Sequence, residues 1–179
     1  MNLAKGNDPI LTTPCQQFNF QEPPTDPVEL AQTLVKFMYD NNGLGLACNQ
    51  VGLPHCMFVM RGYPDNFACF NPKVVYQNSE MVSMEESCLS FPGLVVKVKR
   101  PKSIRARFTM ANGQIRTEPF TGMAARVFLH EMDHLDGVLF YNRANPYHKE
   151  VALKKWQRGD MSYIKINNIG EYNEHLLRG

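Results

Sequence analysis

The sequence predicts an α+β fold in which antiparallel β-sheets pack around a central helix, with one helix near the N-terminus and another near the C-terminus. Strand-like segments follow one another from residue 55 to residue 117. The dipeptide Asn112-Gly113 lies between the last two and is a strong signal for a two-residue β-hairpin. An apolar helical segment comes after these strands and does not alternate with them, which favours antiparallel pairing.

The first element is a predicted helix from about Asp26 to Asn42. Asp26 and Glu29 form an acidic capping pattern around Pro27, which suits the first turn of a helix. Apolar residues then recur at helical spacing and are Leu30, Leu34, Phe37 and Met38. Gly43 is expected to end this helix.

The middle of the chain contains a series of segments with the residue pattern of β-strands. Strands are predicted at residues 55–60, 67–75, 82–86, 94–99, 104–108 and 114–117. The central helix follows, with Thr121 as its expected N-cap and Gly137 as its expected stop. Its first turns are strongly apolar and contain Ala124, Ala125, Val127, Phe128 and Leu129. A further helix is predicted at residues 147–158.

A chain of 179 residues is long enough for one domain with a substantial core and too short for two large ones. We therefore expect a single domain over residues 1–179, with its core at about 10–142 and a C-terminal helix and tail at about 143–179. The formal net charge is +2 without a long run of Lys or Arg, so charge alone indicates no nucleic-acid-binding surface.

The beginning of the chain lacks the apolar core of a signal peptide, and no stretch is apolar for long enough to cross a bilayer. A cytoplasmic protein without a membrane partner is therefore expected. An organellar or viral origin would change the location to the organelle or to the host cytoplasm.

The segment His130-Glu131-Met132-Asp133-His134 has the spacing of a catalytic metal site on a helix. Residues four apart lie on one face of a helix, so His130 and His134 can bind one ion. Glu131 then lies beside the ion without binding it, where it can take a proton from a water and pass it to a leaving group. Buried histidines and a buried glutamate need partners, and a metal would supply them. The segment therefore indicates a metal-dependent hydrolase.

A catalytic metal usually has three protein ligands and one open position. Spacing alone leaves the third ligand open between Cys88, at a polar strand end, and His148 or Glu150 after the helix. The chain has five cysteines, an odd number without CxxC spacing. We therefore expect most of them to be small buried residues and no disulfide framework.

Residues 43–50 read Gly-Leu-Gly-Leu-Ala-Cys-Asn-Gln and follow the first helix. The glycines permit close backbone approach to a ligand or a tight turn. Gln50 carries an amide that can donate to a developing oxyanion. A plain helix stop and turn is the simpler interpretation when this segment is taken alone.

These segments, in this order, resemble the three signature motifs of the peptide deformylases. The family patterns are G-x-G-x-A-A-x-Q, E-G-C-L-S and Q-H-E-x-D-H-L, and the matching segments here are residues 43–50, 86–90 and 129–135. The likeness extends from about Ile10 to about Phe140. The departures are Cys48 for the second alanine, Ser87 for the central glycine and Leu129 for the glutamine.

The departure at Ser87 is the most consequential, because a glycine beside a metal ligand can serve for its backbone conformation. Every reactive group is still present. We therefore expect retained activity, with a change in rate or substrate preference as the possible effect of Ser87.

The resemblance implies a metal-dependent hydrolase that removes the formyl group from N-formylmethionine of newly made polypeptides and releases formate. The implied ligands of one divalent metal are Cys88, His130 and His134. Fe²⁺ is the expected native metal, and Zn²⁺ or Ni²⁺ can replace it, since a thiolate and two imidazoles suit all three. Glu131 would take a proton from the metal-activated water and then protonate the departing amine. Gln50 and the backbone N–H of Leu89 would stabilise the oxyanion.

The resemblance also implies where the substrate lies. The methionine side chain is expected in an apolar pocket beside the metal helix, with the candidate residues Leu44, Met84, Leu89 and Val127. The peptide backbone is expected to pair with extended backbone near Gly45. We further predict that Asp133 pairs with an arginine such as Arg100 and braces the helix.

The implied partners are N-formylmethionyl nascent peptides, and the ribosome exit region is a further candidate. Two other functions compete with this one. A general zinc peptidase would use His148 or Glu150 as its third ligand, but it leaves Cys88 and Gln50 unexplained. An inactive relative could bind a metal, formylated peptides or the ribosome without turnover, but the presence of Glu131 argues against it.

Overall fold

The structure is a computed structural model, and it describes residues 1–159. Its α-helices are α1 (Pro27–Asp40), α2 (Gly122–Leu135) and α3 (Pro146–Gln157). Its strands are β1 (Gly45–Ala47), β2 (Met57–Met60), β3 (Phe67–Gln77), β4 (Met81–Cys88), β5 (Phe91–Pro101), β6 (Ser103–Thr109) and β7 (Ile115–Thr121). Short 3₁₀ helices lie at Pro9–Thr12, Cys48–Val51 and Phe140–Arg143. The predicted α+β class is confirmed.

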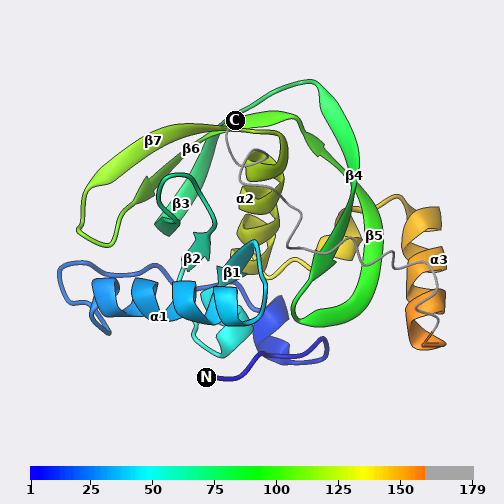
Figure 1. The fold of residues 1–179 in the computed structure, drawn as a ribbon, viewed down its shortest axis with the longest axis horizontal. Coiled ribbons are helices and arrows are strands. Elements are labelled where there is room, and N and C mark those ends of the chain that lie inside the picture. Colours follow the sequence, from blue (N-terminus) through cyan, green and yellow to red (C-terminus); the bar gives the residue numbers. More distant parts are fainter. Residues whose placement is uncertain (160–179) are drawn as a thin grey trace.

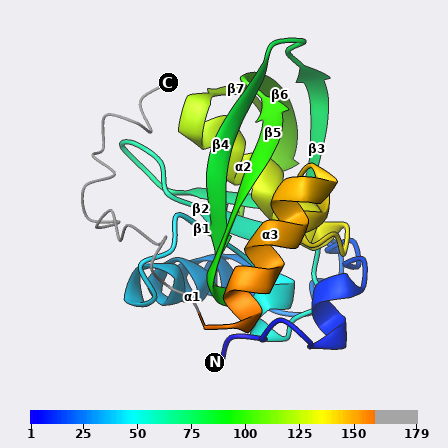
Figure 2. The same ribbon diagram turned by 90° about the vertical axis from the view of Figure 1, so that its right-hand side faces the viewer.

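The strands form two antiparallel sheets. One has five strands in the order β1-β2-β3-β6-β7, and the other is the long β4–β5 ribbon. Figure 1 shows α2 enclosed between the five-stranded sheet and the β4–β5 ribbon. Figure 2, turned by 90°, shows the ribbon passing across α2, with α3 beside β5. The helix with the metal motif is therefore central, as the sequence predicted.

Helix α1 begins as its sequence predicts. The carboxylate of Asp26 accepts hydrogen bonds from the backbone N–H groups of Val28 and Glu29 at 2.8 and 3.0 Å, and Pro27 occupies the first turn. The buried face of α1 consists of Leu30, Ala31, Leu34 and Met38. This face packs against β1 and β2 and holds the glycine-rich segment that follows the helix.

Helix α2 is buried on nearly all sides because sheets cover it from both directions. Thr121 occupies the N-cap position, but its side chain makes no capping hydrogen bond. Phe128 is fully buried and packs against Phe58 and Phe120 from the five-stranded sheet. Gly137 follows the helix at φ +68°, and a Cβ there would lie 2.7 Å from the carbonyl oxygen of Thr12. Glycine is therefore required at this stop.

The predicted hairpin exists, but its turn is longer than two residues. Strands β6 and β7 pair as far as Thr109 and Ile115, and the N–H of Met110 then donates to the carbonyl of Gln114. Gly113 has φ +83°, and the side chain of Asn112 accepts from the N–H of Gln114. A glycine in the left-handed region at the end of a three-residue turn explains the difference.

Strand β1 was not predicted, since its three residues lie inside a segment that resembles a turn. The predicted C-terminal helix agrees with α3 to within one residue at each end. The predicted tail beyond residue 159 lies outside the described residues. Among residues 1–159, no helix is long and apolar enough to cross a membrane.

Candidate active site

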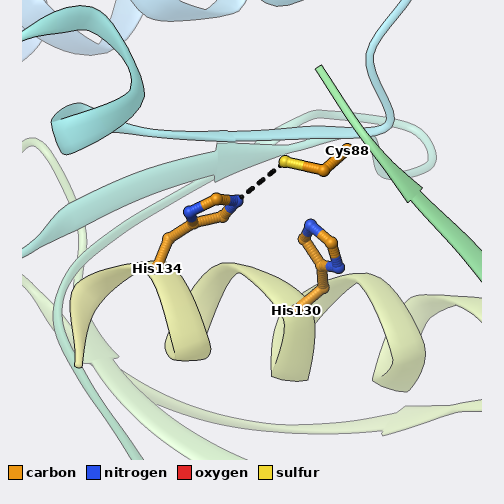
Figure 3. Close-up of side chains that lie close together, drawn as sticks. All are labelled: Cys88, His130 and His134. Carbon is orange, nitrogen blue, oxygen red and sulfur yellow. Dashed lines mark hydrogen bonds between the residues drawn. The ribbon is translucent and has the colours of Figure 1, made fainter. Parts of the chain in front are cut away.

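Three buried side chains converge between α2 and the end of β4. His130 and His134 lie one turn apart on α2, and Cys88 is the last residue of β4. Their donor atoms all lie within 4.8 Å of one another. Figure 3 shows the thiol of Cys88 above the two imidazole rings, with Sγ 3.2 Å from Nε2 of His134. Secondary structure thus places the two motifs, and tertiary packing brings them together.

The donor set fits a divalent metal ion. A tetrahedral site with one thiolate and two imidazole ligands has ligand atoms about 3.5 Å apart, which is close to the spacing seen here. The alternative ligands His148 and Glu150 lie exposed on α3 and are not part of this cluster. Among the described residues, the cysteine is therefore the third donor.

His130 is oriented by Glu86, which lies two residues before Cys88 on β4. Nδ1 of His130 lies 3.1 Å from Oε2 of Glu86, so the opposite ring nitrogen faces the cluster. A carboxylate that holds the far nitrogen of a histidine ligand fixes the orientation of its ring and raises its basicity. The sequence analysis did not single out Glu86 for this role.

Glu86 is itself held by two buried arginines. Arg100 binds both of its carboxylate oxygens, at 2.6 and 2.8 Å, and Arg126 binds one of them at 2.8 Å. Arg100 also donates to Asp133 at 2.8 Å, which is the pair that the sequence predicted. Asp133 receives a further pair of hydrogen bonds from Arg143. This charged network ties β4 and β5 to α2 behind the histidines.

The role of Arg126 was missed, although the sequence contains a signal for it. Arg126 follows Ala124 and Ala125 within the apolar approach to the motif and is 5% exposed. Its guanidinium donates to the carbonyls of Val82 and Val98 as well as to Glu86. An arginine inside an otherwise apolar buried helix needs such partners, so its presence predicts a buried carboxylate nearby.

Burial controls the protonation of the site. Burial raises the pKa of Glu131 to about 7, near the value expected of a base that works at neutral pH. Burial also holds the pKa of His134 well below its ordinary value, which leaves that imidazole neutral. For Glu86, burial alone would raise the pKa, but the hydrogen bonds from Arg100 and His130 outweigh it and lower the pKa below its ordinary range.

His130 behaves differently from His134. Burial lowers its pKa, but hydrogen bonds with Cys88 and Glu86 outweigh burial and raise the pKa to about 10. A metal that binds His130 must therefore displace a proton. Metal binding at this site is expected to release protons and to weaken as the pH falls.

Gly45 allows Glu131 to approach β1. A Cβ on Gly45 would lie 2.4 Å from Oε1 of Glu131, closer than real Cβ atoms come to other groups. The other carboxylate oxygen, Oε2, is buried and has no hydrogen-bond partner among residues 1–159. A buried carboxylate oxygen needs a proton donor, and a water or a substrate amine in the adjoining cavity would supply one.

Gln50 points its amide nitrogen at the cluster. Its Oε1 accepts from the backbone N–H of Ala47 at 3.0 Å, which fixes the orientation of the amide. Its Nε2 then lies 3.4 Å from Sγ of Cys88 and 3.3 Å from Oγ of Ser90. The donor is therefore preoriented toward the place where a reacting carbonyl would lie.

A cavity of about 280 Å³ opens onto this cluster. The predicted residues on its wall are Leu44, Gly45, Gln50, Cys88, Leu89, Val127, His130 and Glu131. Met84 is not on the wall, because it lies two residues beyond Glu86 along β4, about 7 Å farther from the metal cluster. Met123, from the first turn of α2, lines the cavity instead and was not predicted.

Ser87 also lines this cavity. Its side chain is exposed on β4, and its backbone has no positive φ, so glycine's conformational freedom is not needed at this position. Ser87 therefore adds a hydroxyl at the cavity wall without straining the strand that carries Cys88. The concern that the sequence raised about the backbone geometry here does not apply.

Comparisons with known proteins agree with this geometry. The family model described as polypeptide deformylase matches residues 1–150. A peptide deformylase of Thermotoga petrophila is 39% identical over 124 residues, which span 69% of this chain and 76% of the relative. One from Rhodopseudomonas palustris is 34% identical over 144 residues, which span 76% and 82% of the two chains.

Solved structures show the same fold. Peptide deformylase 1B of Arabidopsis thaliana superposes with a TM-score of 0.82 and 28% identity, covering 91% of this chain and 92% of the other. The peptide deformylase of Thermus thermophilus superposes with a TM-score of 0.81 and 32% identity, covering 89% and 94%. With its thiol and two imidazoles beside a buried glutamate, and with these likenesses, the chain belongs to the polypeptide deformylase family.

Proposed function

We propose that this chain removes the formyl group from N-terminal N-formylmethionine, the activity of its family, with Glu131 as the acid and base of the reaction. The observation that carries the proposal is the convergence of Cys88, His130 and His134. Cys88 and His130 face a cavity that Glu131 also lines. Three donors leave one position open, as a catalytic metal site requires.

The residues that would hold the metal are Cys88, His130 and His134. A divalent ion in this position lowers the pKa of a water and polarises a carbonyl. We propose Fe²⁺ as the native ion, with Zn²⁺ and Ni²⁺ as substitutes. The support is the donor set, because a thiolate with two imidazoles suits all three ions.

Glu131 accepts the proton of the attacking water, since its carboxylate is buried at the cavity wall and its pKa is near neutrality. The water oxygen bonds to the formyl carbon, and the C–N bond then breaks. The departing nitrogen receives the proton from Glu131, which leaves formate and a free N-terminal amine.

Gln50 and Leu89 stabilise the oxygen on which negative charge develops. The orientation of the Gln50 amide supports this role, since its Nε2 faces Cys88. Leu89 follows Cys88 directly, so its backbone N–H lies next to the proposed metal ligand. A single donor of this kind is worth about 3 kcal/mol of transition-state stabilisation.

The methionine side chain occupies the apolar part of the cavity, whose walls include Leu44, Leu89, Met123 and Val127. The peptide backbone pairs with β1 at Gly45. Strand β1 is an edge strand of the five-stranded sheet, and an edge offers free backbone groups to an extended peptide. New polypeptides are made in the cytoplasm, so we place the activity there, close to the ribosome exit region.

The first test is release of free amine from formyl-Met-Ala-Ser by the Fe²⁺-loaded protein prepared without oxygen. Glu131→Gln should lower kcat/KM by at least about 100-fold, because a positioned acid and base contributes that much or more. Its metal content should equal that of the parent protein, since Glu131 is not a proposed ligand.

Glu150→Gln is the matched control, because Glu150 is an exposed glutamate on α3 and belongs to the competing peptidase model. It should leave kcat/KM unchanged within about twofold. Turnover that survives in Glu131→Gln, or that is lost in Glu150→Gln, would contradict the proposed roles. Metal bound in the parent protein without any turnover would favour an inactive binding protein.

A further inference from the structure

The face of the five-stranded sheet that points away from α2 carries exposed positive charge. The inner residues of β6 are Ile104, Ala106 and Phe108, which are buried in the same core as α2. Successive side chains of a strand point to opposite faces of a sheet. Arg105 and Arg107 therefore point away from α2, and both are exposed.

The register of β3 adds to this charge. Lys73 lies directly opposite Arg107, and Tyr76 lies directly opposite Arg105. Lys73 is exposed, and Tyr76 is 57% exposed. Like charges in directly opposed positions destabilise a sheet. The pairing of Lys73 with Arg107 therefore works against folding, which points to a role other than stability.

We name these four residues, Lys73, Tyr76, Arg105 and Arg107, the basic sheet face. On the other side of β6, the residues of β7 opposite Arg107 and Arg105 are Thr117 and Pro119. No carboxylate therefore occupies a position of β3 or β7 directly across from the two arginines. The positive charge of the face is not neutralised within the sheet.

The cations of the basic sheet face lack the carboxylate partners that three other exposed lysines have. Ion pairs join Lys36 to Asp40, Lys102 to Glu80 and Lys154 to Glu150. Within residues 1–159, no ion pair or side-chain hydrogen bond involves Lys73, Arg105 or Arg107. Three unpaired cations are thus gathered on one surface.

A groove extends this surface toward the ribbon. A cavity of about 470 Å³ lies between β3 and β5, and its lining includes Lys73 and Lys99. It also includes Asp136 and the ion pair of Asp133 with Arg143. Lys99 is exposed, and within the part of the chain that the structure describes it also has no ion pair. The groove therefore has one lysine without an ion pair on β3 and one on β5.

The positive and negative residues are also unevenly distributed along the sequence. Residues 97–126 contain eight Lys or Arg, of which all but the buried Arg100 and Arg126 are exposed, and one Glu. Residues 1–66 contain three Lys or Arg and six Asp or Glu. The net charge of +2 conceals this division. A surface of this kind attracts polyanions over a distance.

We infer that the basic sheet face, together with Lys99, binds single-stranded RNA through its phosphates, with Tyr76 stacking on a base. Arginine and lysine on a sheet surface beside an exposed aromatic ring are the groups that bind single strands, because the charges follow the backbone and the ring stacks on a base. The choice of RNA over DNA rests on the proposed function, since new polypeptides are made on RNA.

The same charges could attract an acidic membrane, but the composition of the face argues against it. The apolar side chains here are Tyr76, the neighbouring Pro119 and Val75, which is 49% exposed beside Tyr76. The other paired positions of the face are Lys, Arg and Thr. Binding at a membrane interface draws on buried apolar area as well as on charge. This face offers little apolar area for insertion.

The test is fluorescence anisotropy of a labelled oligouridylate of about ten nucleotides, titrated with the metal-loaded full-length protein. With three to four phosphates neutralised, the dissociation constant should rise roughly 20- to 50-fold between about 50 and about 200 mM KCl. Arg105→Gln/Arg107→Gln should weaken binding at least about tenfold and should reduce the slope of log affinity against log salt by about 1.4. Tyr76→Ala should weaken binding about fivefold or more with the salt slope unchanged.

The matched control is Lys36→Gln/Lys154→Gln, which removes two exposed positive charges on α1 and α3. Its RNA affinity should stay within about twofold of the parent protein, because both lysines lie outside the basic sheet face. Equal weakening in the control and in Arg105→Gln/Arg107→Gln would overturn the inference, and so would the absence of RNA binding. Tighter binding of oligodeoxyuridylate than of oligouridylate would overturn the choice of RNA.

Vesicles of phosphatidylcholine and phosphatidylglycerol provide the test of the membrane alternative. Binding to these vesicles that depends on Arg105 and Arg107, without RNA binding, would replace RNA with a lipid surface. Deformylation of formyl-Met-Ala-Ser by Arg105→Gln/Arg107→Gln should match the parent protein. RNA binding and deformylation are therefore measured separately, and either can fail without the other.

Discussion

Gly45 and Glu131 show how one missing side chain sets the geometry of a reaction. The carboxylate of Glu131 occupies the space that a Cβ on Gly45 would need. Glycine is not needed at this position for its backbone conformation, since Gly45 lies in β1 without a positive φ. Glycine is needed because the carboxylate of Glu131 lies so close to the backbone of β1. This contact holds the proposed base against the strand that would pair with the substrate.

Gly45→Ala should lower kcat/KM for formyl-Met-Ala-Ser at least about tenfold, because displacing a catalytic group by about 1 Å can cost even more than that. The metal content should not change, since the atoms nearest to a Cβ at Gly45 belong to Glu131, which is not a proposed ligand. Steady-state kinetics and metal analysis on the same preparation provide the measurement.

A double-mutant cycle tests whether this loss acts through Glu131. In the Glu131→Gln background, adding Gly45→Ala should cost less than about threefold, since the group that it displaces no longer works as a base. Full additivity of the two losses would show that Gly45 acts on the substrate and not on Glu131.

At the scale of elements, the buried charges join the β4–β5 ribbon to α2. Glu86 on β4 and Asp133 on α2 both bind Arg100 on β5. The side chains of all three are nearly inaccessible to water, so each charge depends on the others for compensation. Both histidines lie on the helix that this network fixes.

Arg100→Ala should lower the free energy of unfolding of the metal-loaded protein by about 3 kcal/mol, because two buried carboxylates each lose one of their two cations. Metal affinity should fall about tenfold, since only Arg126 would still hold Glu86 against His130. Urea unfolding and competition with a metal chelator measure the two effects.

Lys102→Ala is the control for this change. Lys102 is paired with Glu80 on the surface, where an exposed ion pair contributes about 1 kcal/mol or less. An Arg100→Ala protein as stable as the control, with unchanged metal affinity, would refute the bracing role of this network.

At the scale of the whole molecule, the metal site joins two parts of the core. Cys88 belongs to the apolar cluster that β5 and α3 share, whereas α2 contributes most of its apolar residues to the cluster under the five-stranded sheet. An ion held by Cys88 and the two histidines would link these clusters directly. Metal binding should therefore stabilise the complete fold.

Removal of the metal with a chelator should lower the melting temperature by roughly 8 °C or more, relative to protein with free metal at about 1,000 times its dissociation constant. The basis is about 4 kcal/mol of linkage at that concentration, with about 2–4 °C per kcal/mol for a chain of this size. Differential scanning calorimetry measures the shift.

Cys88→Ser should abolish most of this metal-dependent shift, because serine replaces the thiolate donor. Cys15→Ser is the control, since Cys15 is a half-buried thiol outside the cluster, and it should keep the shift. A shift of the same size in both variants would exclude Cys88 as a ligand.

The sequence by itself determined the fold class, the positions of the main elements and the two histidine donors. It did so because capping residues, strand alternation and histidines four apart are local patterns whose physical meaning does not depend on the rest of the chain. The order of the motifs, through their resemblance to a family, determined which cysteine lies near the histidines. Spacing alone had left that choice open.

Only the tertiary structure decided what depends on contacts between distant residues. Glu86 and Arg126 form an ion pair although they lie 40 residues apart in the chain. Met123 lines the cavity in place of Met84, because Met84 lies farther along its strand than the cavity extends. The basic sheet face arises in the same way, because Lys73 and Arg107 become neighbours only through strand register. Register and burial are properties of the packed chain, so local patterns do not contain them.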